Sequence, residues 1–301
     1  MRGRGRGRQL VASRRSGAAS SAERGPRSTV LSALWNRIYG DFLMPSRLPS
    51  YRMLLQSALR IGYEVLSVEA MWQLVSGPGL DPEQRYLVLR HDVDTDPRTA
   101  ARMWAIDREL GIRPSFYFRL STLDPPLMRA VAAGGGEASY HYEELATVAK
   151  RRGLTTRAEL EAHLPEARAE FARNLASIRS RTGLPMPVVS AHGDFANRRA
   201  GVPNWAILAD DALRARAGVE AEAYDHALIG RMTSQYTDVP PPRYWSPADP
   251  AAALAAGDHV VFVLVHPRHW HVDRPGNARD DARRAVEGLR FELARRRARR
   301  T

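Results

Sequence analysis

Along most of the chain, short apolar runs alternate with stretches in which hydrophobic residues recur at helical spacing. Short apolar runs bounded by glycine, proline or aspartate predict buried strands. These expected strands cover residues 63–68, 86–94, 114–120, 137–141, 188–192, 235–239 and 259–266. Stretches with helical spacing separate them, and this alternation predicts a parallel α/β fold, either a barrel or an open sheet.

The helices expected from the apolar spacing connect these strands. They cover residues 31–42, 51–61, 69–75, 97–110, 126–133, 142–152, 160–181 and 279–300. The long segment 160–181 contains Pro165, where a helix can restart because proline suits the first turn. Residues 1–29 are rich in glycine, serine, alanine and arginine without an apolar period, which predicts a disordered tail. The remainder, 30–301, is expected to form a single domain.

The strand at residues 86–94 passes directly from buried apolar residues into a group of ionisable side chains. Because side chains alternate across a strand, Asp92 and Asp94 should emerge on one face and His91 on the other. Carboxylates at such a place must be paired, protonated or bound to metal. Helix capping is the alternative, but Asp96 already stands in the capping position of the next helix.

Three more expected strands end at a histidine, namely His141, His192 and His266. The carboxyl ends of parallel strands gather on one face, so these histidines should meet Asp92 and Asp94 there. Aspartate and histidine ligands without a thiolate suit zinc or another divalent ion with a position open for water. A bound hydroxide, a carboxylate base and a histidine acid would together hydrolyse an amide or an ester.

Composition narrows the class of protein. The chain has 301 residues, 44% of them hydrophobic, and no cysteine, so a disulfide framework, a thiolate metal site and a cysteine nucleophile are all excluded. No apolar run approaches the roughly 18 residues that a membrane-spanning helix needs. A signal peptide would have an apolar segment after its basic start, and no such segment follows the basic start of this chain. A cytoplasmic location is the expectation.

The net charge of +12 comes mostly from the two ends of the chain. Eight arginines lie in the first 27 residues and five in the last seven, opposed there only by Glu23. Such basic ends can attract anionic surfaces weakly. No aromatic residue is interleaved with the N-terminal arginines, so no specific nucleic-acid partner is expected. Between the ends the chain is close to neutral.

Five segments, in order, resemble the conserved motifs of polysaccharide deacetylases of the NodB-homology type, carbohydrate esterase family 4, in its His-Asp-Val-Asp branch. They span residues 89–94, 140–145, 190–193, 236–245 and 264–270. The resemblance covers about residues 50–275. It implies a distorted (β/α) barrel and metal-dependent removal of acetyl groups from N-acetylated saccharides or sugar precursors, with zinc as the first choice of metal.

The resemblance also implies roles for individual residues. Asp92 would be the catalytic base and His266 the general acid. The metal ligands would come from Asp94 and His141, completed by Glu143 or His192. Substrate binding is expected from four residues: His91, Asp238, Trp245 and Trp270. For the two tryptophans, stacking on a sugar ring and plain core packing are the alternatives.

Departures from the family pattern leave alternatives open. The usual adjacent aspartate pair is here Asp-Val-Asp, so either Asp92 or Asp94 could bind metal. The second motif lacks its second histidine, because Leu145 stands four residues after His141. Its third motif has His192 followed by Gly193 in place of an arginine. The competing hypotheses are a non-catalytic saccharide-binding relative with a degenerate metal site and a hydrolase of another amide. The oligomeric state stays open.

Overall fold

The computed structural model describes the backbone of residues 26–298 and the side chains of residues 32–297. The chain divides into two units, one ending at Trp35 and the other starting at Asn36. The predicted disorder of residues 1–29 falls mostly outside the described residues, but residues 26–29 belong to helix α1 (Pro26–Ile38), so there the prediction is wrong. No helix in the described part of the chain combines the length and apolarity needed to cross a bilayer.

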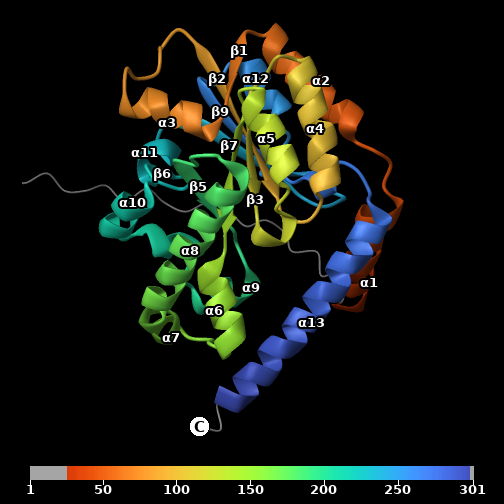
Figure 1. Cartoon of the computed structure of the whole chain (residues 1–301). Helices are drawn as coiled ribbons and strands as arrows, with labels where there is room; N and C mark the ends of the chain where they lie inside the picture. The colour runs from red at the N-terminus through yellow and green to blue at the C-terminus, as the bar shows by residue number, and fades with distance from the viewer. Residues whose placement is uncertain (1–25, 299–301) are drawn as a thin grey trace, which may run out of the picture. The chain divides into compact units, whose positions relative to one another are not determined.

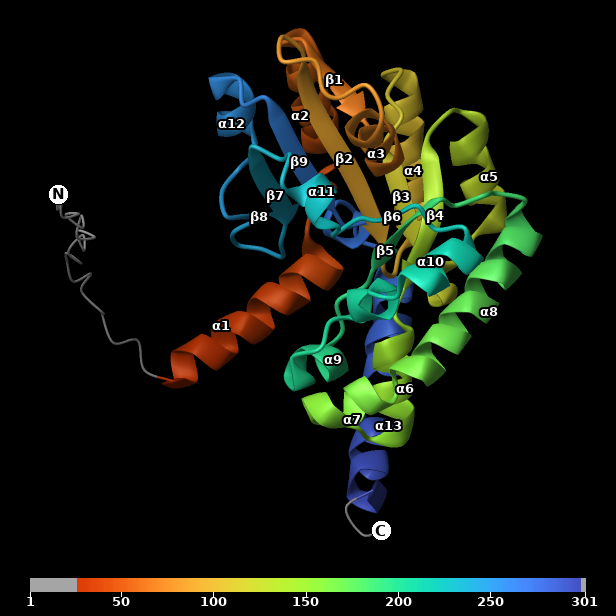
Figure 2. The ribbon, with the colours of Figure 1, turned by 90° about the vertical axis from the view of Figure 1, so that its left-hand side faces the viewer.

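A mostly parallel sheet forms the centre of the second unit (Figure 1). Its strands are β1 (Tyr63–Leu66), β2 (Arg85–Val93), β3 (Ser115–Phe118), β4 (Glu137–Tyr142), β5 (Val188–Ala191), β6 (Ala221–Glu222), β7 (Ser234–Asp238), β8 (Trp245–Ser246) and β9 (Val260–Val265). They are ordered β6-β5-β4-β3-β2-β9-β7-β8, with β1 also paired to β2. Figure 2 shows β9, β2, β3 and β4 side by side. Only the β7–β8 pairing is antiparallel among the described strands.

Helices connect the strands and cover the sheet. The α-helices after α1 are α2 (Leu48–Arg60), α3 (Val68–Ser76), α4 (Pro97–Glu109), α5 (Pro125–Ala133), α6 (Glu144–Arg152), α7 (Arg157–Ala162), α8 (Leu164–Thr182), α9 (Phe195–Ala200), α10 (Asp211–Ala217), α11 (His226–Ile229), α12 (Ala251–Ala256) and α13 (Arg274–Ala298). Short helices of other types cover 39–43, 120–122, 204–208 and 267–269. Figure 1 shows α2, α4 and α5 lying over the strands.

Successive side chains of β2 point alternately into the curved sheet and toward its helix-covered outside. Tyr86 and Val88 join an inner apolar cluster with Met71 of α3. Leu87 and Leu89 join an outer cluster with residues of α2 and α4. Because the side-chain period of a strand is two, the next inward positions belong to the ionisable residues near the carboxyl end. The apolar layer therefore fills one end of the interior and leaves the other end for polar chemistry.

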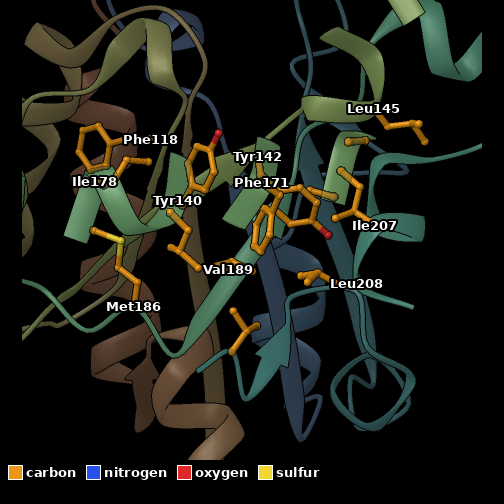
Figure 3. Packing of buried hydrophobic residues seen from close by; sticks show 14 of the residues in the cluster. Phe118, Tyr140, Tyr142, Leu145, Phe171, Ile178, Met186, Val189, Ile207 and Leu208 are labelled. Atoms are coloured by element: carbon orange, nitrogen blue, oxygen red, sulfur yellow. The ribbon is translucent and has the colours of Figure 1, made fainter. Parts of the chain in front are cut away.

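The largest core cluster lies on the outer face of β3, β4 and β5, beneath α5, α6 and α8 (Figure 3). Phe171 of α8 packs between two aromatic residues of β4. Its ring is stacked 6.1 Å from that of Tyr140 and lies edge-on 5.0 Å from that of Tyr142. Phe118 and Val189 extend this cluster to the neighbouring strands. Burial of these outward-facing residues holds the helices against the sheet.

The strand prediction is confirmed for all seven expected segments, within a few residues at their ends. The helix expected over 160–181 is two helices, because Thr156 and Glu159 form a capping box that starts α7, and Pro165 lies in the first turn of α8. The pattern missed β6, β8 and the helices α9 to α12. These elements have two to seven residues, too few to show a period.

The parallel α/β class is confirmed, and the sheet has the form of a distorted, incompletely closed barrel. The hydrogen-bonded path begins at β6 and ends at β8, and no pairing joins these two strands in the described region. Strands separated in sequence, such as β2 and β9, are neighbours in the sheet. All strands except β8 run in one direction, so their carboxyl ends share one face.

Glu144 is a buried carboxyl in this core, and its ionisation should make stability depend on pH. Burial raises its pKa to about 7, although Tyr140 and Asn174 donate hydrogen bonds to it. Because the pKa of Glu144 in the folded protein exceeds the unfolded value near 4.5, its protonated carboxyl contributes fully to stability below pH 4.5. This contribution is lost as pH rises through 7. Relative to Glu144→Gln, the wild-type free energy of unfolding should fall by about 1–3 kcal/mol between pH 5 and 8.

Chemical denaturation of both proteins at several pH values measures this difference. The glutamine keeps an oxygen acceptor but cannot ionise, so it isolates the titration of one carboxyl. A constant difference across the pH range would mean that Glu144 does not change its protonation there. Glu170, an α8 carboxylate paired with Arg151, is the matched position: Glu170→Gln should show no comparable change over the same range.

Candidate metal centre and active site

Polar side chains from separate strands meet at the carboxyl face of the sheet, as the sequence predicted. Asp92 lies near the end of β2 and His141 near the end of β4, while His192 and His266 directly follow β5 and β9. With Asp94 they line one open cavity of about 460 Å³. This volume lies within the usual range for ligand-binding clefts.

Asp94, His141 and His192 each place one possible ligand atom within 4.8 Å of those of the other two. The Nε2 atom of His141 lies 3.4 Å from Oδ1 of Asp94, and Nε2 of His192 lies 3.5 Å from its Oδ2. Zinc bonds of about 2.0–2.1 Å at tetrahedral angles separate neighbouring ligand atoms by roughly 3.4 Å. Each imidazole nitrogen therefore lies at about this ligand-to-ligand distance from one oxygen of Asp94, as expected of side chains that could share one metal ion.

Hydrogen bonding supports a cation at this point. Nδ1 of His141 donates to the carbonyl oxygen of Ser190 over 3.0 Å, so Nε2 of the neutral ring carries a lone pair. That lone pair faces Oδ2 of Asp92 at 3.3 Å and Oδ1 of Asp94 at 3.4 Å. Oδ1 of Asp94 is buried and has no hydrogen-bond partner among the described residues. Acceptors that face one another repel unless a proton or a metal ion lies between them.

The electrostatics of His192 agree with this interpretation. Burial alone would lower the pKa of His192, but Asp94 and Glu143 raise it to about 9. Burial likewise would raise the pKa of Asp94, yet His192 and His141 hold it well below its ordinary value. The carboxylates thus create a site that attracts positive charge, which a proton on His192 or a divalent ion can supply.

Glu143 lies behind His192, outside the group of Asp94, His141 and His192, although with His192 and Asp194 it forms a second possible group of metal ligands. Arg119 donates to both carboxylate oxygens of Glu143, with N–O distances of 2.7–2.9 Å. Oε2 of Glu143 faces Nδ1 of His192 at 3.4 Å, on the ring edge opposite the candidate ligand atom. The carboxylate can therefore orient the imidazole, as the outer partners of metal-binding histidines commonly do.

Glu143→Gln should therefore weaken metal binding without abolishing it. Loss of the carboxylate beside Nδ1 removes support for the His192 ring but leaves all three ligand atoms in place. Outer partners of this kind typically change metal affinity about 10- to 100-fold. Titration of the metal-free protein with zinc against a competing chelator measures the change. Loss comparable to that of a ligand substitution would place Glu143 itself on the metal.

Asp92 is held by Arg90, a residue that the sequence analysis did not assign to the site. Nε and Nη2 of Arg90 each donate over 2.7 Å to a different oxygen of Asp92. Both side chains point inward because they lie two positions apart in β2. Burial alone would raise the pKa of Asp92, but Arg90 lowers it below the ordinary value. The sequence signal that could have identified Arg90 is its position two residues before Asp92 on a buried strand, which puts both side chains on the same face.

Of the two aspartates, Asp94 has the geometry of a ligand and Asp92 that of an ionised base. Both oxygens of Asp92 already accept hydrogen bonds from Arg90, whereas Asp94 has an oxygen with no hydrogen-bond partner among the described residues. Asp92 still borders the cavity. This arrangement favours the first of the sequence-based assignments, with base and ligand on the same strand end.

His266 is fixed by a buried carboxylate. Its Nδ1 donates to Oδ1 of Asp238 over 2.6 Å, and its backbone N–H donates to Oδ2. Burial lowers the pKa of His266, but Asp238 raises it to about 9. Nε2 remains directed toward the site, 4.0 Å from Asp94. Asp238 is almost fully buried, so its predicted role in substrate contact is wrong, and its contacts instead position His266.

The predicted contact of His91 with substrate is also wrong, because the side chain is fully buried on the helix side of β2. Its ring stacks on Phe116 with 4.0 Å between the centroids. Nδ1 donates to the carbonyl of Ser115, and Nε2 lies 2.7 Å from the hydroxyl of Tyr51. Burial lowers the pKa of His91 to about 4. Alternation along the strand places His91 in the core because it places Asp92 in the site.

Of the two alternatives for Trp245 and Trp270, core packing is the one that their burial supports. Trp270 is 1% exposed and Trp245 is 8% exposed, and their rings pack against each other. Nε1 of Trp270 donates to Asp238 over 2.8 Å, which helps to fix the carboxylate. The aromatic residues that line the cavity are Tyr224 and Phe195, about 40% and 41% exposed. Phe195 begins the short helix α9, and Tyr224 lies in the turn after β6, where the sequence shows no period.

Comparison with known proteins finds fold neighbours only. No protein-family model matches the sequence, and no curated protein matches it either. The structure is similar to that of the Streptococcus pyogenes deacetylase PplD in complex with acetate, with 11% sequence identity and a TM-score of 0.39, over 73% of this chain and 83% of that chain. It is also similar to a Streptococcus mutans CE4 esterase, with 12% identity and a TM-score of 0.35, over 81% of this chain and 96% of that chain.

Proposed function

We propose that this protein is a metal-dependent hydrolase that removes the acetyl group from an N-acetylated saccharide. One observation carries the proposal: Asp94, His141 and His192 place three possible ligand atoms within 4.8 Å of one another, beside a carboxylate and a histidine that could move protons. A divalent ion there, with zinc as the first candidate, would supply a Lewis acid and a bound water of lowered pKa.

The remaining residues supply the proton transfers that amide hydrolysis needs. Asp92, kept ionised by Arg90, accepts a proton from the attacking water. His266 donates a proton to the departing nitrogen, and Asp238 holds its ring in the orientation that directs Nε2 into the cavity. A non-catalytic binding protein would need neither group, so the base and the acid together favour an enzyme.

A saccharide fits the cavity because Tyr224 and Phe195 offer exposed rings to the apolar face of a sugar. Release of acetate from N-acetylated oligosaccharides by the zinc-loaded protein tests the proposal. Activity should disappear with a chelator and return with added zinc. Zinc-loaded protein that releases no acetate from any N-acetylated saccharide, but cleaves another amide, would establish a hydrolase of different specificity.

A further inference from the structure

Arginines from two helices converge on the mouth of the catalytic cavity. Arg198 comes from α9, and Arg283 and Arg284 come from α13, which runs beside α6 (Figure 1). We call these three residues the arginine rim. All three line the same 460 Å³ cavity as the candidate metal ligands. Their charge therefore acts on whatever occupies that cavity.

One buried carboxylate organises the α13 side of the arginine rim. Asp280 is 5% exposed, and its Oδ1 accepts from Nη2 of Arg283 over 2.6 Å. Its Oδ2 lies 2.7 Å from both Nε of Arg284 and Nη1 of Arg268. Arg268 also pairs with Asp41 and Asp281, so Asp280 is shared mainly by Arg283 and Arg284. Each guanidinium has five N–H donors, more than this one carboxylate can accept from two arginines. Arg283 and Arg284, 40% and 52% exposed, keep donors available to a ligand.

Arg198 has no side-chain hydrogen bond or ion pair among the described residues. The acidic residues that share its part of the cavity wall are already engaged by Lys150. Nζ of Lys150 lies 3.0 Å from Asp194 and 3.2 Å from Glu287. The guanidinium of Arg198 thus borders the cavity with all of its donors unused by the described residues.

We propose that the arginine rim binds an acidic group, a carboxylate or a phosphate, of the acylated substrate, so that the enzyme selects an anionic N-acetylated saccharide. The proposal rests on the deacetylase function proposed above and adds the charge of its substrate. Guanidinium groups match the planar or tetrahedral oxygens of these acids with paired, charge-assisted hydrogen bonds.

Calorimetric titration of the full-length, zinc-loaded protein tests the inference with three probes. N-acetylglucosamine 1-phosphate carries a phosphate, N-acetylmuramic acid a carboxylate, and N-acetylglucosamine neither. At least one acidic probe should bind about tenfold or more tightly than the neutral sugar. Preference between the two acids then identifies which group the rim accepts. Higher salt should weaken binding of the acidic probe more than that of the neutral one.

Arg198→Ala should reduce the ratio of acidic to neutral affinity about tenfold, and Arg284→Ala should reduce it as well. Arg199→Ala is the matched control, because Arg199 lies next to Arg198 in α9, is 56% exposed and does not line the cavity. The control should keep the wild-type ratio. All of these side chains are substantially exposed, so the variants should fold as the wild type does.

Equal affinity for acidic and neutral probes, or an acid preference that survives in Arg198→Ala and Arg284→Ala, would overturn the inference. This failure is distinct from failure of the proposed function. Acetate release without acid preference would leave the deacetylase intact and remove the role of the arginine rim. Acid preference that requires Arg198, in a protein that hydrolyses no N-acetyl group, would support the role of the arginine rim and overturn the proposed deacetylase function.

Discussion

Asp94→Asn is expected to remove bound zinc and hydrolytic activity together. The amide keeps the size of the side chain but loses the negative charge that attracts the cation and the carboxylate oxygens that face the two imidazoles. Zinc retained after purification should fall from near-stoichiometric to a small fraction, and kcat/KM should fall by at least about 10³-fold. Metal analysis and acetate release on the same preparation measure both effects.

His141→Ala and His192→Ala should reproduce this result, because each removes one of the three converging ligand atoms. Asp211→Asn is the control, since Asp211 is an exposed aspartate in the first turn of α10. It should retain both zinc and activity. Full zinc content in Asp94→Asn would show that Asp94 is not a ligand, whereas lost zinc with unchanged activity would show that the reaction does not need the metal.

His266→Ala is expected to separate chemistry from metal binding. The imidazole faces the site but lies 4.0 Å from Asp94, outside the group of ligand atoms formed with His141 and His192. Removing a general acid typically lowers the rate by about 10²- to 10⁴-fold. The variant should therefore lose kcat by this factor while it keeps its zinc. Steady-state kinetics together with metal analysis distinguish this result from that of Asp94→Asn.

Asp238→Asn should show an intermediate loss of kcat, because the ring of His266 would lose the acceptor that orients it while the imidazole itself remains. His163→Ala is the control, since the His163 side chain bonds the carbonyl of Glu159 near the surface and does not line the cavity. Loss of zinc in His266→Ala would identify His266 as a ligand. Unchanged kcat would require another proton donor for the leaving group.

The largest errors of the sequence-based assignments have one geometric cause. The resemblance implied that His91 binds substrate, and it offered sugar stacking as one of two alternatives for Trp270. A strand turns alternate side chains in opposite directions, and therefore His91 belongs to the outer core with Tyr51. Trp270 likewise belongs to the outer cluster, where its Nε1 donates to Asp238. Proximity along the chain did not imply exposure to the cavity.

Sequence periodicity determined the parallel α/β class, seven of the strands and the set of strand-end residues that meet in the site. These are local consequences of side-chain alternation and of turn residues, and parallel strands necessarily bring their carboxyl ends together. The motif residues Asp92, Asp94, His141 and His266 could therefore be identified before any coordinates. The short elements could not, because two to seven residues show no period.

Only the tertiary structure decided what each polar residue does. It paired Glu143 with Arg119 and Asp92 with Arg90, and it left His192 to complete the group with Asp94. It also brought the arginine rim, from helices about 85 residues apart, to the same cavity. These partnerships join strands and helices distant in sequence. Their distances and burial depend on how the whole sheet curves and packs, which no local pattern of hydrophobic and polar residues specifies.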